Sequence, residues 1–214
     1  MPLYLGSSKA GALYHGSTKI GQAYLGNVKI YQSGDPYNPL GLPAYTIRLR
    51  YEDDVTPTFS KGTGVQVSVS PNIWDLTYEN TNWRQLLHNH SQLLEILGAN
   101  STGVTSMSNM LAGTKLSTIP LFDTSAVTSF NEMCSNLKTL TRVPLFNVSS
   151  AVSVTRMFVM CVNVESGALD LYNRLSNQAT VSAHTECFDL CGRDTVTGAA
   201  ELAQIPQSWG GTMA

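Results

Sequence analysis

The sequence predicts an α+β fold in which a short solenoid with helical caps follows an N-terminal β-repeat module and a β-hairpin. Three observations predict it: a ten-residue repeat that opens the chain, an alternating apolar pattern at residues 45–51, and a longer repeat in the C-terminal half. One copy of such a repeat cannot close a core. Neighbouring copies or another chain must therefore cover its apolar residues.

The first repeat occupies residues 3–32, where tyrosine recurs at every tenth position and lysine follows each tyrosine five positions later. The six residues are Tyr4, Tyr14, Tyr24, Lys9, Lys19 and Lys29. Gly-Ser or Gly-Asn pairs lie between tyrosine and lysine, which predicts short strands joined by tight turns. A row of aromatic residues on a module without its own core normally meets a partner, so these six are candidate partner-docking residues. Packing onto the strands at 45–70 of the same chain is the alternative.

Residues 33–43 contain three prolines and two glycines, a composition that predicts a stiff connector. After it, apolar and polar residues alternate: Tyr45, Ile47, Leu49 and Tyr51 share one face of an expected strand. A second expected strand at 65–70 completes a half-buried β-hairpin or a small sheet. The predicted domains are 1–32 for docking or oligomerisation, 33–43 as linker, 44–71 as hairpin and 72–214 as repeat domain.

The repeat domain is expected to start with helical turns at 82–88 and 91–98. Val104, Met107 and Met110 then recur as Val127, Phe130 and Met133, at an offset of 23 residues. Short extended segments containing Pro120 and Pro144 separate these helical turns. A period of 23 to 24 lies within the leucine-rich-repeat range, so the sequence predicts a leucine-rich-repeat-like solenoid.

Two helices complete the predicted repeat domain. One covers 166–175 with Ser166 as its N-cap, and the other covers 199–204 and closes the open end of the stack. Two rows of equivalent positions are expected to be buried in the stack. The first row is Met110, Met133, Met157 and Cys187, and the second is Thr114, Leu137, Cys161 and Cys191.

The repeat resembles the BspA-type leucine-rich repeats of bacterial surface proteins and of phages of gut bacteria. The motif is Val104-Thr-Ser-Met-Ser-Asn-Met-Leu111, followed by Ile119-Pro-Leu-Phe-Asp-Thr-Ser-Ala-Val-Thr128, and the likeness covers residues 92–192. The opening repeat and connector resemble the N-terminal portion of structural proteins from tailed phages of gut bacteria. The resemblance implies a virion component, such as a head decoration, head fibre or tail protein.

Composition excludes some partners. The 13 lysines and arginines are scattered and outnumbered by 15 acidic residues, so nucleic acid is not an expected partner. No apolar run approaches the roughly 18 residues of a membrane span, so membrane insertion is not expected either. The N-terminus has neither the basic start nor the apolar stretch of a secretion signal.

Candidate catalytic and metal groups are explained better as structural residues. His184, Cys187 and Cys191 could supply three zinc ligands, but the two cysteines also fall on the buried rows. Weaker alternatives are a disulfide between Cys161 and Cys191, a metal pair at His88 and His90, and a calcium site at 52–54. We therefore expect no enzyme activity, cofactor or metal.

These observations favour a non-enzymatic phage structural protein located in the virion and assembled in the host cytoplasm. Its N-terminal repeats would dock to other virion proteins or form a homo-oligomer, and the repeat domain would be exposed. A host-surface protein or glycan is a further candidate partner. The alternative is a bacterial cell-surface adhesin or host-interaction module.

Overall fold

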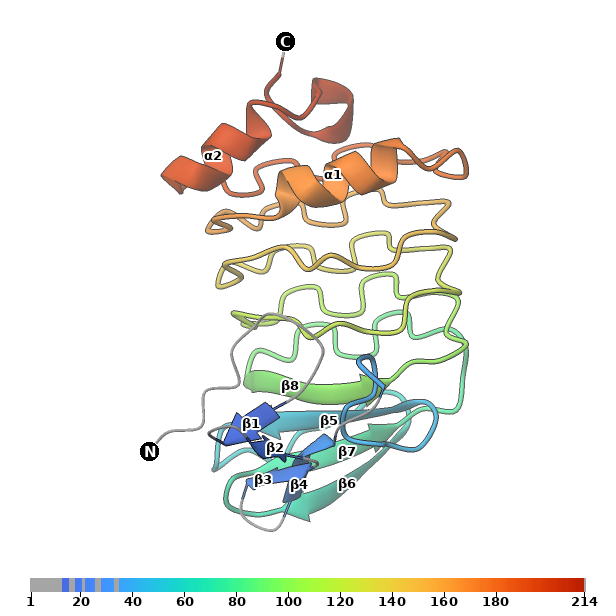
Figure 1. Ribbon diagram of the computed structural model, residues 1–214, viewed down its shortest axis with the longest axis vertical. Coiled ribbons are helices and arrows are strands. Elements are labelled where there is room, and N and C mark those ends of the chain that lie inside the picture. The colour runs from blue at the N-terminus through green and yellow to red at the C-terminus, as the bar shows by residue number, and fades with distance from the viewer. Residues whose placement is uncertain (1–12, 16–17, 21, 26–27, 33–34, 214) are drawn as a thin grey trace.

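The computed structural model describes the backbone of four short strands between residues 13 and 32, and residues 35–213 with their side chains (Figure 1). The strands are β1 Leu13–His15, β2 Thr18–Ile20, β3 Gln22–Leu25, β4 Val28–Gln32, β5 Thr46–Tyr51, β6 Thr63–Ser68, β7 Ile73–Thr77 and β8 Leu93–Asn100. The helices are α1 Ala168–Ser176, α2 Val196–Leu202 and the 3-10 turn η1 Gln207–Trp209.

The connector does not extend as a free spacer. Leu40 and Leu42 are buried, and the side chain of Asn38 bonds both the N–H and the carbonyl of Leu42. Leu40 packs so closely over Gly98 of β8 that a Cβ there would lie 2.8 Å from its Cδ1. The connector is therefore part of the folded body, fixed against β8 through Leu40.

Strands β5 to β8 form one antiparallel sheet in the order β6-β7-β5-β8. The predicted alternation is present in β5, where Ile47, Leu49 and Tyr51 are buried. The expected hairpin of 45–51 with 65–70 is wrong, because β7 lies between β5 and β6. Both strands nevertheless belong to one small sheet, which was the alternative. The segment at 73–77 was not expected to be a strand, although its buried Ile73 and Leu76 hold it in the core.

The predicted fold class, a leucine-rich-repeat-like solenoid with helical caps, is wrong. The regular secondary structure of the described residues is mainly the four-stranded antiparallel sheet with two short helices. Residues 101–166 contain neither a helix nor a named strand. The helical turns expected at 91–98 are instead strand β8, and residues 82–88 are irregular turns.

Backbone conformation explains this correction. Residues with positive φ interrupt the helical turns expected within the repeats, including Asn109, Glu132, Arg156 and Glu186 with φ of 53–56°. A left-handed residue ends the run of helical dihedrals, so each turn stops before a helix can propagate. Pro120 and Pro144 lack the N–H group that a sheet ladder requires.

Irregular coils nevertheless lie one above another from β8 towards the C-terminus (Figure 1). Backbone N–H groups of one coil donate to carbonyls of the next, as in Leu111 to Met133 at 2.9 Å and Cys134 to Met157 at 2.9 Å. Isolated parallel bridges join Ser106 to Ser129 and Ser129 to Ser153. These bonds satisfy the polar backbone groups of segments that have no regular secondary structure.

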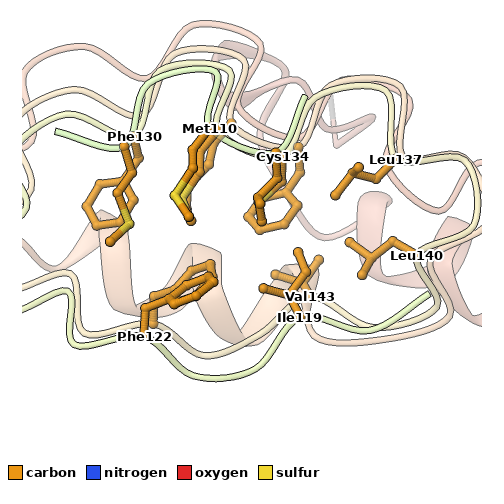
Figure 2. Close-up of a cluster of buried hydrophobic side chains, with 14 of the residues drawn as sticks. Met110, Ile119, Phe122, Phe130, Cys134, Leu137, Leu140 and Val143 are labelled. Atoms are coloured by element: carbon orange, nitrogen blue, oxygen red, sulfur yellow. The ribbon is translucent and has the colours of Figure 1, made fainter. Parts of the chain in front are cut away.

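The core lies inside the coils and is continuous with the buried face of the sheet. Figure 2 shows side chains from two opposite runs of the coils facing one another, with Phe130, Cys134 and Leu137 on one side and Phe122 and Val143 on the other. Both rows of positions expected to be buried are buried, with exposures of 0–2%. The sequence pattern thus identified core positions correctly while the secondary structure assigned to them was wrong.

Of the two C-terminal helices, α1 starts later than expected and α2 starts earlier. Helix α1 begins after Gly167, and the predicted cap Ser166 provides no side-chain cap bond. The Glu201 carboxylate of α2 accepts the N–H groups of Gly167 and Leu169 instead, both at 3.1 Å. Helix α2 begins after Thr195, whose Oγ1 accepts the Gly198 N–H at 3.0 Å.

Candidate functional site

The structure describes four of the six predicted docking residues, by their backbone. Strands β1 and β2 form one two-stranded antiparallel sheet, and β3 and β4 form another. Tyr14 lies opposite Lys19, and Tyr24 lies opposite Lys29. Tyr4 and Lys9 lie outside the described residues.

The same register therefore occurs in two successive repeats. In each of these two repeats one aromatic and one cationic residue are therefore cross-strand partners in the backbone register. The sequence period of ten residues corresponds to one hairpin.

Polar side chains form columns on the outside of the coils. The Thr105 Oγ1 donates to the Thr81 carbonyl at 3.2 Å, and the Thr128 Oγ1 donates to the Thr105 carbonyl at 3.2 Å. The Asn163 Nδ2 donates in the same way to the Lys138 carbonyl at 2.7 Å. Hydroxyl and amide groups thus tie neighbouring coils together at the solvent boundary, in a chain with 13% charged residues.

All four cysteines are free, buried thiols. Burial raises the pKa of Cys161 to about 12, with a smaller opposing effect from a backbone hydrogen bond with Leu137. Burial also raises the pKa values of Cys134, Cys187 and Cys191. The thiolate is the reactive form of cysteine. These thiols stay protonated and contribute to core packing instead of acting as nucleophiles.

The candidate zinc trio is not assembled as a ligand set. The His184 ring stacks on Trp209 with centroids 4.1 Å apart, and its Nδ1 lies 3.2 Å from the Ser208 carbonyl oxygen. Cys187 and Cys191 are buried in the core. Among the residues described with side chains, no group of three or more His, Cys, Asp or Glu residues could hold a metal ion.

The two histidines at 88 and 90 have different surroundings. His88 is exposed, whereas the His90 Nδ1 lies 2.6 Å from the Tyr51 hydroxyl and its ring stacks on Phe59. Burial, with a smaller contribution from His88, lowers the pKa of His90. The neutral imidazole is therefore part of the packing beside β5.

The acidic turn at 52–54 is held by a buried amide. The Asn72 Nδ2 donates to the carbonyls of Glu52 at 2.8 Å and Val55 at 2.6 Å. Its Oδ1 accepts from Gln66 and from the Trp74 indole, each at 2.8 Å. Asn72 thus connects this turn to β6 and β7, a structural role that the sequence analysis did not identify.

A cavity of about 540 Å³ was also missed. It lies where the end of helix α1 meets the coil at 145–149, and Tyr37 of the connector also lines it. Arg174, Asn173 and Asn177 of the α1 region contribute polar groups to its wall. No local sequence signal could have found it, because its lining comes from three segments far apart in the chain.

Comparison with known proteins provides no homologue from which a function could be transferred. No family model matches the chain, and no curated protein and no solved structure matches it. Neither helix described in the structure has the length and apolarity to span a bilayer.

Proposed function

We propose that this protein is a non-enzymatic structural component of a phage particle. In this proposal residues 1–32 dock to other virion proteins or to further copies of the chain, and the body formed by residues 35–213 is exposed for binding. The observation that carries the proposal is the repeated hairpin register, with Tyr14 opposite Lys19 and Tyr24 opposite Lys29.

Hairpin energetics support the docking role. A two-stranded hairpin is at best marginally stable in water and needs a further strand or a packed surface. The described hairpins form two separate two-stranded sheets, and neither pairs with the four-stranded sheet. A tyrosine and a lysine repeated on successive hairpins supply apolar area and charge for a partner surface.

The construction of the body supports its role as a stable exposed unit. Its core runs from the sheet through the coils to Trp209, and its sulfur-containing and aromatic residues lie mostly inside. Polar columns cover the outside of the coils. The particle is taken to be that of a tailed phage because the opening repeats and connector resemble the N-terminal portion of phage structural proteins.

The docking role is tested by replacing Tyr4, Tyr14 and Tyr24 together with serine. We expect the full-length protein to form an oligomer and this variant to lose it, because the apolar contact area of the hairpins is removed. The measurement is molar mass in solution by light scattering coupled to size-exclusion chromatography.

The matched control replaces three exposed apolar residues of the body, Leu94, Leu121 and Val196, with serine. This control should keep the mass of the unmodified protein. A tyrosine variant that retains the oligomer would contradict the docking role. Mass spectrometry of purified phage particles then tests whether the protein belongs to the virion. A bacterial adhesin would be found on cells and not in particles.

A further inference from the structure

The cavity beside α1 has the size of a small-molecule site. Its volume of about 540 Å³ lies within the roughly 300–1,000 Å³ typical of ligand pockets. The apolar lining residues Phe146 and Val148 are themselves buried, so the cavity offers little free apolar surface. Most of the remaining lining is polar.

Side-chain amides dominate this polar lining. The Asn147 Oδ1 accepts the Ser149 N–H at 3.1 Å, which leaves the amide NH₂ group of Asn147 as a donor. The Asn177 Nδ2 donates to the Asn173 carbonyl at 2.6 Å, which leaves the Asn177 Oδ1 as an acceptor. The cavity therefore presents both donors and acceptors, and hydroxyl groups of a sugar can pair with both.

One aromatic residue and one cation complete the site. Tyr37 is half-buried and lines the cavity, and its backbone N–H donates to the Asp35 Oδ1 at 2.8 Å. A tyrosine ring packs against the apolar face of a pyranose. Arg174 is the charged residue of the lining, and none of the described lining residues is acidic.

The charge of Arg174 is not neutralised by a carboxylate. The four ion pairs of the described residues involve Arg48, Arg50, Arg156 and Arg193. Arg174 is exposed, and its position in the last turn of α1 also suits the helix dipole. A guanidinium binds a carboxylate through two parallel hydrogen bonds, which neutral hydroxyls cannot reproduce.

We propose that this cavity binds a sugar that carries a carboxylate, with Arg174 on the carboxylate, the amides on the hydroxyls and Tyr37 on the ring. The inference rests on the proposed function, since it names a ligand for the exposed body. Hexuronic acids and nonulosonic acids both have this chemistry, and the experiment below separates them.

The test titrates the full-length protein with galacturonic acid and, separately, with N-acetylneuraminic acid, using isothermal calorimetry and ligand-observed NMR. Galactose and the methyl ester of N-acetylneuraminic acid are the matched neutral sugars. We expect saturable binding of at least one acidic sugar, with its neutral counterpart bound roughly tenfold more weakly or worse. Binding of galacturonic acid would indicate a hexuronic acid as the ligand, and binding of N-acetylneuraminic acid would indicate a nonulosonic acid.

The deciding variant is Arg174→Gln, which should lower the affinity for the acidic sugar roughly tenfold or more. Arg84→Gln is the matched control, because Arg84 is exposed and does not line the cavity. Unchanged thermal unfolding of Arg174→Gln shows that the loss is not due to misfolding. Absence of binding, equal binding of the neutral sugar, or unchanged affinity in Arg174→Gln would each overturn the inference.

The tyrosine-to-serine variant separates this inference from the docking role. If it loses the oligomer but keeps sugar binding, both proposals hold. If the unmodified protein forms the oligomer but binds neither acidic sugar, the sugar site is wrong and docking through residues 1–32 is unaffected.

Discussion

Met133→Asp is expected to unfold the protein or leave it barely stable. The Met133 side chain is fully buried in the core of the coils, and its carbonyl accepts the Leu111 N–H of the preceding coil at 2.9 Å. A carboxylate at this position would lose its hydration without gaining a partner. We expect a loss of about 4 kcal/mol or more, a large part of the total stability of a typical domain.

Urea unfolding followed by tryptophan fluorescence measures this effect. Met160→Asp is the matched control, because Met160 is 43% exposed and has a φ of 62° that aspartate tolerates. We expect this control to lie within about 0.5 kcal/mol of the unmodified protein. Equal stability of the two aspartate variants would contradict the assignment of the Met133 row to the core.

Asn72→Leu should cost about 2–4 kcal/mol, because it breaks four side-chain hydrogen bonds at a site that is 1% exposed. The carbonyls of Glu52 and Val55 and the Trp74 indole N–H would lose their partner at part-buried positions. Asn72→Asp keeps the shape but turns both donated bonds into contacts between oxygens, so it should be similarly harmful.

Asn163→Leu is the matched control for this change. Asn163 is exposed and makes one side-chain bond, to the Lys138 carbonyl. We expect a loss of about 1 kcal/mol or less, since water can replace the amide. If Asn72→Leu costs no more than this control, Asn72 does not hold the turn at 52–55 in the way described.

Apolar spacing predicted the core positions well because burial requires only that equivalent residues recur. It could not predict the path of the backbone between them. Glu132 and Arg156 adopt left-handed conformations that their residue types do not favour, so nothing local distinguished a turn from a helix. Hydrogen bonds to the neighbouring coil stabilise these residues, as in Glu132 to Thr155 at 2.9 Å.

Strand β8 shows a second limit of pattern recognition. Leu93 and Ile96 are buried three positions apart, which is a helical spacing, and they lie in a strand whose register shifts twice against β5. Such irregularities change which residues face the core and remove the period of two. The pattern therefore favoured a helix where the sheet required a strand.

The two candidate sites differ in what the sequence could reveal. The tyrosine and lysine repeat was visible because each tyrosine and its opposed lysine lie only five residues apart in the sequence, as Tyr14 and Lys19 do. The cavity joins Tyr37, the coil at 145–149 and the end of α1. Only the folded chain brings these segments together, so the sequence contained no pattern for it.

The central claim is that residues 1–32 provide association while the body is complete without them. It is tested most directly by comparing the molar mass and urea unfolding of residues 35–214 with those of the full chain. The cut at 34 preserves Leu40 and Leu42, which are buried against the body. The account predicts a folded monomer for residues 35–214 and an oligomer for the full chain. An unfolded fragment, or one that associates like the full chain, would contradict it.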